Sequence, residues 1–120
     1  MRSTLIFACL SSVVLASACS KKPDPSAAPA SVSCFIADQH RCEEAPAPDK
    51  AQDEARTIEC SSVSGKLSRP ATCPTADFVG KCTTTEKGIV SVHRWYKGAD
   101  PEYQKSACAE PFKGVWSTTF

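Results

Sequence analysis

Eight cysteines and two histidines are the side chains in this 120-residue chain that could hold a metal ion or serve as nucleophile and base. Zinc sites use close pairs such as C-x-x-C or H-E-x-x-H, and the sequence contains neither pattern. It also lacks G-x-S-x-G and S-x-x-K, which present a serine nucleophile. The sequence therefore predicts no catalytic residue, no metal site, no cofactor and no enzyme activity.

A histidine–arginine dipeptide occurs twice, as His40-Arg41 and His93-Arg94. Because histidine changes charge near physiological pH, one hypothesis is that these four residues bind an anionic ligand. The alternative is that each arginine lies on the exposed face of a strand. Glu43 and Glu44 are interpreted as a solvated pair, because neighbours on a strand point to opposite faces and cannot act together as acid and base.

Aromatic rings form a second candidate surface, on which a sugar ring could stack, and Trp116 near the C terminus is the residue singled out for this role. The aromatic set comprises Trp95, Tyr96, Tyr103, Phe112, Trp116 and Phe120. Leu67 is the single leucine after Cys34. The sequence therefore favours these rings as the core of the domain.

The charge balance indicates no partner, since 14 Lys+Arg residues oppose 13 Asp+Glu residues for a formal net charge of +1. Such a chain has no field that would attract nucleic acid or hold an anionic membrane by charge alone. We expect a monomer without a nucleic-acid partner.

The N-terminus has the pattern of an export signal, with Arg2 before an acid-free apolar stretch too short to span a bilayer, which takes about 20 residues. The stretch ends in Leu15-Ala16-Ser17-Ala18-Cys19, which resembles the lipobox of bacterial lipoproteins. This resemblance implies a signal peptide over residues 1–18 and lipidation of Cys19 with fatty acids such as palmitate. The alternatives are an ordinary cleavage site after Ala16-Ser17-Ala18, giving a secreted protein, and a retained signal anchor.

The cysteine count agrees with lipidation. Cys9 leaves with the signal peptide, and lipidation of Cys19 leaves an even set in an oxidising compartment. The set predicted to form disulfides is Cys34, Cys42, Cys60, Cys73, Cys82 and Cys108. The spacing alone does not choose among the possible pairings.

Residues 19–33 are predicted to be a disordered linker rich in proline, alanine and lysine that tethers a cysteine-rich domain over residues 34–120. Ser20 follows the lipidated position, where an Asp would retain many lipoproteins at the inner membrane. The resemblance therefore implies an outer-membrane location.

Two helices are predicted from capping residues. Asp49 caps a helix over residues 49–60, with Gln52 three positions on. The inward face of this helix is predicted to be Ala51, Ala55 and Ile58. Asp100 and Pro101 begin a second helix over residues 100–110, with Tyr103 and Ala107 predicted to face inward.

The strongest strand signal lies at residues 79–85 and 89–96, joined by a three-residue loop with Gly88 in the left-handed conformation. That hairpin places Cys82 opposite Val92 and Phe78 opposite Tyr96. Residues 34–41 and 114–120 are weaker strand candidates. The predicted fold class is a small disulfide-stabilised α+β domain with an antiparallel sheet and two short helices.

A faint internal duplication relates two units, each with a cysteine, a His-Arg dipeptide, a helix that ends near a cysteine, and a glycine. A real duplication would pair Cys34 with Cys60 and Cys82 with Cys108, and Cys42 with Cys73 would then join the halves. Residues 75–116 are also similar to cysteine-rich hypothetical lipoproteins of myxobacteria, a resemblance that implies no particular activity.

The predicted function is a lipid-anchored, noncatalytic module that binds a protein or glycan of the cell envelope. The alternative is a small disulfide-locked inhibitor of an extracellular enzyme, with residues 61–72 as the inhibitory loop. An enzyme would require His93 or His40 in a concave site beside an acid or a serine.

Overall fold

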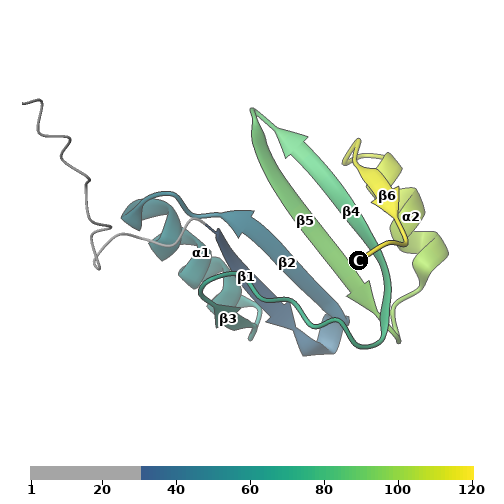
Figure 1. Cartoon of the computed structure of the whole chain (residues 1–120), viewed down its shortest axis with the longest axis horizontal. Coiled ribbons are helices and arrows are strands. Elements are labelled where there is room, and N and C mark those ends of the chain that lie inside the picture. The colour runs from purple at the N-terminus through teal and green to yellow at the C-terminus, as the bar shows by residue number, and fades with distance from the viewer. Residues whose placement is uncertain (1–30) are drawn as a thin grey trace, which may run out of the picture.

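Two strand–strand–helix–strand units follow each other in the computed structural model, which describes residues 31–120. The elements are β1 (Ser31–Ile36), η1 (Ala37–Gln39), β2 (Arg41–Pro46), α1 (Lys50–Ser62), β3 (Lys66–Ser68), β4 (Phe78–Glu86), β5 (Ile89–Tyr96), α2 (Pro101–Ala109) and β6 (Val115–Ser117). They form one antiparallel sheet in the order β3-β1-β2-β5-β4-β6, so the second half mirrors the first (Figure 1). The predicted α+β class is confirmed, and the order of the elements repeats in the two halves.

The start of the domain differs from the expected boundary. β1 begins at Ser31, so residues 31–33, assigned from the sequence to the linker, belong to the sheet, and Val32 and Ser33 are buried. The predicted signal peptide, Cys19 and the linker up to residue 30 lie outside the described residues. The predicted strand over residues 34–41 is broken by η1, which ends at His40 with a φ of 48° and turns the chain into β2.

One row of cross-strand neighbours runs over the helix-bearing face of all six strands. In sheet order the row is Leu67, Cys34, Glu43, His93, Cys82 and Trp116. Its two halves are related by a pseudo-twofold axis that passes between Glu43 and His93. Cys34 and Cys82 thus occupy equivalent positions in the two units.

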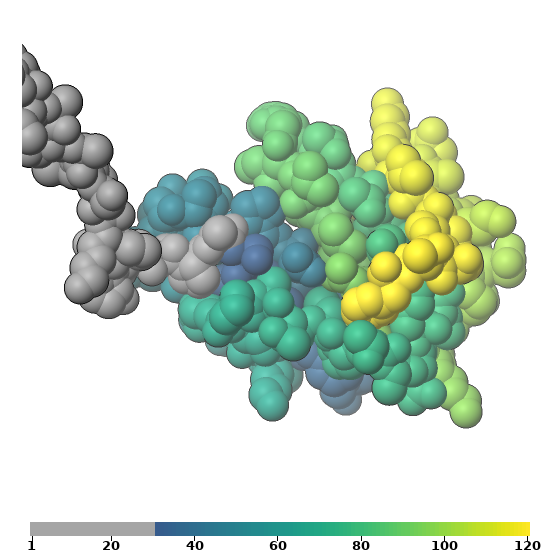
Figure 2. Space-filling view, in the orientation of Figure 1, coloured from purple at the N-terminus to yellow at the C-terminus, as the bar shows by residue number. Residues whose placement is uncertain are grey.

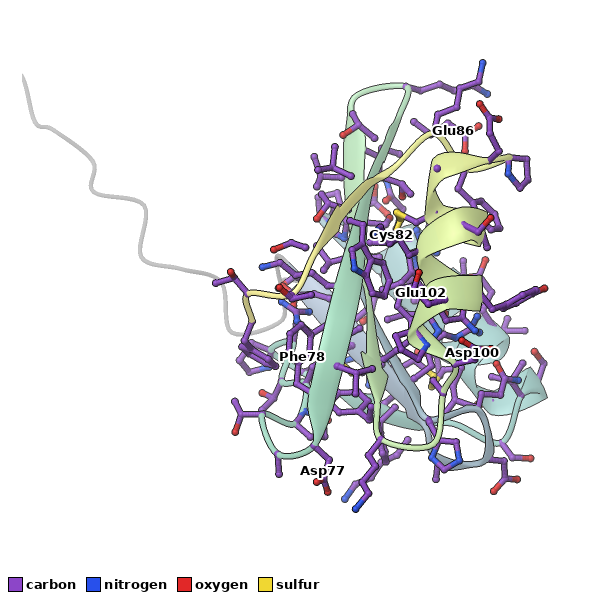
Figure 3. All side chains as sticks on the ribbon, turned by 90° about the vertical axis from the view of Figure 1, so that its right-hand side faces the viewer. Asp77, Phe78, Cys82, Glu86, Asp100 and Glu102 are labelled. Carbon is purple, nitrogen blue, oxygen red and sulfur yellow. A yellow bond between two sulfur atoms is a disulfide. The ribbon has the colours of Figure 1, made fainter. Side chains whose placement is uncertain are left out.

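Disulfides from this row hold both helices on the same side of the sheet. Cys34 is bonded to Cys60 at the end of α1 and Cys82 to Cys108 at the end of α2, each pair 26 residues apart. Figure 3 shows Cys82 between the sheet and α2, with Phe78 on the opposite side. These two pairings are the ones that the duplication predicted.

The opposite face of the sheet carries the third disulfide, Cys42–Cys73. In Figure 1 the connection from β3 to β4 crosses in front of β1 and β2, while α1 lies behind them. The Tyr96 hydroxyl donates to the Pro74 carbonyl at 2.9 Å and holds the end of this connection on β5. Figure 2 shows that the C-terminal segment, in yellow, covers part of the same face.

The β4–β5 hairpin has a tighter turn than predicted. Glu86 pairs with Ile89, and the two-residue turn has positive φ at both Lys87 (51°) and Gly88 (80°). Such turns match the natural twist of the strands. Cys82 consequently lies opposite His93 rather than Val92, and Phe78 meets Tyr96 as predicted only because a bulge between Phe78 and Gly80 absorbs the difference.

The predicted inward face of α1 is wrong, and that of α2 is wrong for Tyr103 but right for Ala107. The side chains of Ala51, Ala55 and Ile58 are exposed on α1, Ile58 by 70%. Tyr103 on α2 is 66% exposed, while Ala107 is half-buried. The bond to Cys34 turns α1 so that its Cys60 side faces the sheet, which the spacing of its apolar residues cannot reveal.

Polar ties stabilise this orientation of α1. The guanidinium of Arg69, which follows β3, donates to Asp53 Oδ1 at 2.7 Å and to the Thr57 hydroxyl. The predicted cap is present, because Asp49 accepts from the Gln52 backbone N–H at 2.8 Å. A polar helix face thus replaces the predicted apolar one.

The aromatic set is divided between core and surface. Trp95 and Tyr96 are buried, and Trp116 packs half-buried against the cluster around Cys82 and Cys108. Tyr103, Phe112 and Phe120 are exposed, contrary to the prediction of a core role. The small core is therefore built around the two helix-anchoring disulfides.

Each of these disulfides also requires a glycine. A Cβ on Gly65 would lie 2.3 Å from the sulfur of Cys34, and one on Gly114 would lie 2.4 Å from the sulfur of Cys82. We expect Gly65→Ala and Gly114→Ala each to lower the free energy of unfolding by about 1–3 kcal/mol through overpacking. Chemical denaturation of the oxidised protein, followed by tryptophan fluorescence, measures this.

The control is Gly88→Asn, at a site with no atom within 4 Å and a positive φ that asparagine tolerates. Its expected effect is below about 0.5 kcal/mol. Equal stability of the Gly65→Ala and Gly88→Asn proteins would contradict the close packing of Gly65 on the disulfide.

Candidate binding groove between the two helices

The centre of the helix-bearing face is left open between the helices. α1 packs on β1 and β3, and α2 packs on β4 and β6, so the helices flank β2 and β5. Three adjoining hollows lie there, and together they form what we call the groove. His93 lines all three hollows, and Glu43 lines two of them.

Two of the hollows are related by the pseudo-twofold axis. The α1 hollow lies against α1 and the α2 hollow against α2, with the Glu43–His93 pair between them. Equivalent positions line both hollows: Cys34 and Cys82, Glu43 and His93, Ala45 and Trp95, Arg56 and Gln104, Glu59 and Ala107, Cys60 and Cys108, and Ser91 and Arg41. The duplicated backbone therefore forms the same hollow twice with different linings.

The outer hollow opens from the other two toward the tip of the β4–β5 hairpin. Its lining includes Arg56 from α1, the hairpin residues Lys87 and Ile89, and Phe112, which follows α2. Phe112 is 66% exposed and also lines the α2 hollow. The groove thus continues from the sheet centre to the end of the hairpin.

Glu43 and His93 are hydrogen-bonded at the centre of the groove, with His93 Nδ1 2.9 Å from Glu43 Oε1. The hydrogen bond from His93 lowers the pKa of Glu43 below its ordinary value of 4.5; burial opposes this shift, and the charge of Arg41 adds to it. The His93 ring stacks on Trp95 at 6.1 Å between ring centroids. Glu43 is therefore an ionised carboxylate at neutral pH.

Arg41 is bound less firmly than the other arginines of the sheet. Its Nη2 is 3.7 Å from Glu43 Oε1, beyond hydrogen-bond distance, and its Nε is buried without an acceptor among residues 31–120. Arg94 Nε is likewise buried without an acceptor among these residues, but Arg94 Nη1 donates to Glu44 Oε2 at 2.8 Å. Arg41 therefore borders the groove with its nearest carboxylate beyond hydrogen-bond distance.

The predicted ligand residues do not all meet in the groove. His93 and Arg41 lie together there. Arg94 lies on the opposite face, where its guanidinium packs over the Phe120 ring at 5.1 Å. His40 is exposed in the turn after η1, with its ring against Gly98. Trp116 packs against Trp95, and it lines none of the three hollows of the groove.

The recurring His-Arg dipeptide is therefore not part of the duplication. His93 is equivalent to Glu43, because each lies directly opposite the half-cystine of its own unit. Glu43 was interpreted from the sequence as solvated, whereas it and Glu44 lie on β2 and are paired with His93 and Arg94. Recognising β2 as a strand paired with β5 would have been needed to find this.

Residues 61–72, the predicted inhibitory loop, are partly built into the domain. They include β3, which pairs with β1. The Thr72 backbone N–H donates to the Ser33 hydroxyl at 2.9 Å, and Arg69 is tied to α1. Only the turn directly after α1 is a free exposed segment in this region.

The groove holds a histidine beside a carboxylate, which is an arrangement that an enzyme would need. Within residues 31–120, however, His93 has no hydrogen bond to a hydroxyl group, and every cysteine there is in a disulfide. The same residues contain no group of three His, Cys, Asp or Glu side chains placed to hold a metal ion. The arrangement provides charge and hydrogen-bond donors for a ligand.

Comparisons with protein-family models, with curated proteins and with solved structures gave no match. The fold and groove define a small disulfide-stabilised α+β domain. Three disulfides are typical of proteins from an oxidising compartment, either extracellular or in the cell envelope. No helix in the described part of the chain is long and apolar enough to cross a membrane.

The lowered pKa of Glu43 in the groove predicts a pH dependence of stability. A carboxyl group whose pKa is lowered on folding stabilises the folded state above its ordinary pKa, and this contribution is lost as the pH falls through the lowered pKa. We expect Glu43→Gln to be less stable than the unmodified protein at pH 7 and to lose less stability below pH 4.5, the ordinary carboxyl value. Urea denaturation over a pH series measures this.

Glu54→Gln is the matched control, because Glu54 is 63% exposed and pairs with Lys50 at the surface of α1. Its acid sensitivity is expected to equal that of the unmodified protein. If Glu43→Gln also matches the unmodified protein at every pH, the pair with His93 contributes nothing to stability.

Proposed function

We propose that this protein is a lipid-anchored component of a bacterial cell envelope that binds a partner molecule, without catalysis, in the groove between α1 and α2. The observation that carries the proposal is the position of His93, which borders all three hollows on the open face of the sheet. Charged, aromatic and amide side chains converge there on a surface that neither helix covers. Binding sites are concave and combine apolar lining with a few polar groups in this way.

The anchor is proposed from the sequence. The lipobox-like Leu15-Ala16-Ser17-Ala18-Cys19 stands before a proline-rich stretch, and every cysteine of residues 31–120 is in a disulfide. Cys19 is then the cysteine left for lipid once the signal peptide is removed. A lipid anchor with several chains gives stable attachment to a membrane.

Mass spectrometry of the unreduced mature protein tests the anchor. We expect an N-terminal Cys19 carrying acyl chains and six oxidised cysteines, so that thiol alkylation without reduction adds no mass. The Cys19→Ser protein is expected to lose the acyl mass and to leave the membrane fraction. An unmodified Cys19 thiol in the mature protein would contradict the lipoprotein proposal.

Photo-crosslinking of the full-length protein in its native envelope tests the groove. A crosslinking residue at Thr84, which lines two hollows, should give a discrete adduct, whereas one at Thr83, on the other face of β4, should not. Filling the α2 hollow with Ala107→Phe should remove most of the Thr84 adduct.

Ala109→Phe is the matched control for this experiment. Ala109 lies on the same helix as Ala107 but is exposed, so the added ring should leave the Thr84 adduct unchanged. An adduct that forms equally with Ala107→Phe, or equally from Thr83 and Thr84, would overturn the assignment of the groove as the binding surface.

A further inference from the structure

The α2 hollow has the composition of a ligand site. Its volume is about 210 Å³, and its apolar lining is formed by Trp95, Ala107, Phe112 and the Cys82–Cys108 disulfide. Five polar side chains border the same space, namely Arg41, Gln104, Thr84 and the hydrogen-bonded Glu43 and His93. Sites for drug-sized ligands usually exceed about 300 Å³, so this hollow has room for one side chain or ring.

The repeated backbone can form a hollow with different lining residues, as the α1 hollow shows. At the equivalent positions the α1 hollow has Ala45 for Trp95, Glu59 for Ala107, Arg56 for Gln104 and Ser91 for Arg41. It is smaller, at about 70 Å³.

The charges of the α1 hollow pair with one another or with a neighbour. Arg56 Nη1 lies 2.9 Å from Glu59 Oε2, and Glu44 is paired with Arg94. These charged groups of the α1 hollow therefore have partners without a ligand.

Arg41 distinguishes the α2 hollow from the α1 hollow, where the charged groups are paired. Its nearest carboxylate, Glu43, is bonded through Oε1 to His93, and Arg41 Nη2 stays 3.7 Å from that oxygen. A guanidinium has five donors and binds a carboxylate through two parallel hydrogen bonds. The side chain of Arg41 is 28% exposed, so a ligand in the hollow can reach it.

We propose that the α2 hollow binds the C-terminal residue of a peptide, with its apolar side chain against Trp95 and Phe112 and its α-carboxylate on Arg41. A C-terminal residue joins an apolar group and a carboxylate within the size of one residue, as the volume of the hollow requires. The preceding residues would leave through the outer hollow, which is larger at about 460 Å³. This inference rests on the proposed function of the groove and names the chemistry of its ligand.

Calorimetry on the full mature protein in detergent micelles tests the proposal with defined peptides. The probes are acetyl-Gly-Gly-Phe with a free carboxylate, the same peptide with a C-terminal amide, and acetyl-Gly-Gly-Lys with a free carboxylate. We expect the first to bind, and amidation or replacement of Phe by Lys to weaken binding about 10- to 100-fold, the range for loss of a charge-assisted contact. The comparison of acid with amide needs no variant and is independent of any folding defect.

Variants then identify the carboxylate site. Arg41→Gln should weaken binding of the free-acid peptide about 10-fold or more and abolish the preference for acid over amide. Arg94→Gln, on the opposite face of the sheet, should leave both unchanged. Equal binding of acid and amide, or no binding of either at about 1 mM, would overturn the proposal.

The failure of this inference can be separated from failure of the groove function. If the Thr84 adduct still forms and Ala107→Phe still removes it, while none of the peptides binds, the groove remains the binding surface and the ligand is not a peptide terminus. Binding of N-acetylmuramic acid, a sugar ring with a carboxylate, in place of the peptides would likewise overturn the peptide assignment. If the Thr84 adduct does not depend on Ala107, both proposals fail.

Discussion

The two equivalent disulfides in the central row of the sheet determine where everything else in this domain lies. Cys34 and Cys82 occupy the strands next to the central pair, and each binds the end of one helix. The helices are thereby held over the outer strands on one side, and the side chains of β2 and β5 between them stay uncovered. A disulfide restricts the unfolded chain as well as the folded one, so these bonds supply stability that the thin core alone could not.

The groove has two unlike ends although the two halves of the backbone are alike. The same backbone positions line both hollows, yet one contains mutually paired charges and the other contains aromatic and aliphatic groups beside Arg41, whose nearest carboxylate is beyond hydrogen-bond distance. The pseudo-twofold axis places Glu43 directly opposite its counterpart His93.

The core is small because it is organised around sulfur rather than around leucine. One cluster consists of Cys34, Ile36 and Cys60, with Leu67 packed on it, and the other consists of Cys82, Trp95 and Cys108. Gly65 and Gly114 let the backbone approach these disulfides closely. This arrangement allows helix faces with few apolar residues and leaves several large apolar side chains, including Tyr103 and Phe112, at the surface.

The sequence by itself determined the fold class, both helix starts and the Ile89–Tyr96 strand, because capping and turn residues act over short distances along the chain. It identified the six disulfide cysteines, whereas their pairing followed from the sequence only on condition that the repeat is real. Only the tertiary structure decided which face each helix buries and that Glu43 meets His93. The face that each helix turns toward the sheet depends on a disulfide to a strand far away in the sequence. Glu43 meets His93 because β2 pairs with β5, and the Glu44–Arg94 contact on the other face likewise joins residues 50 positions apart. No local pattern of residues encodes either of these distant contacts.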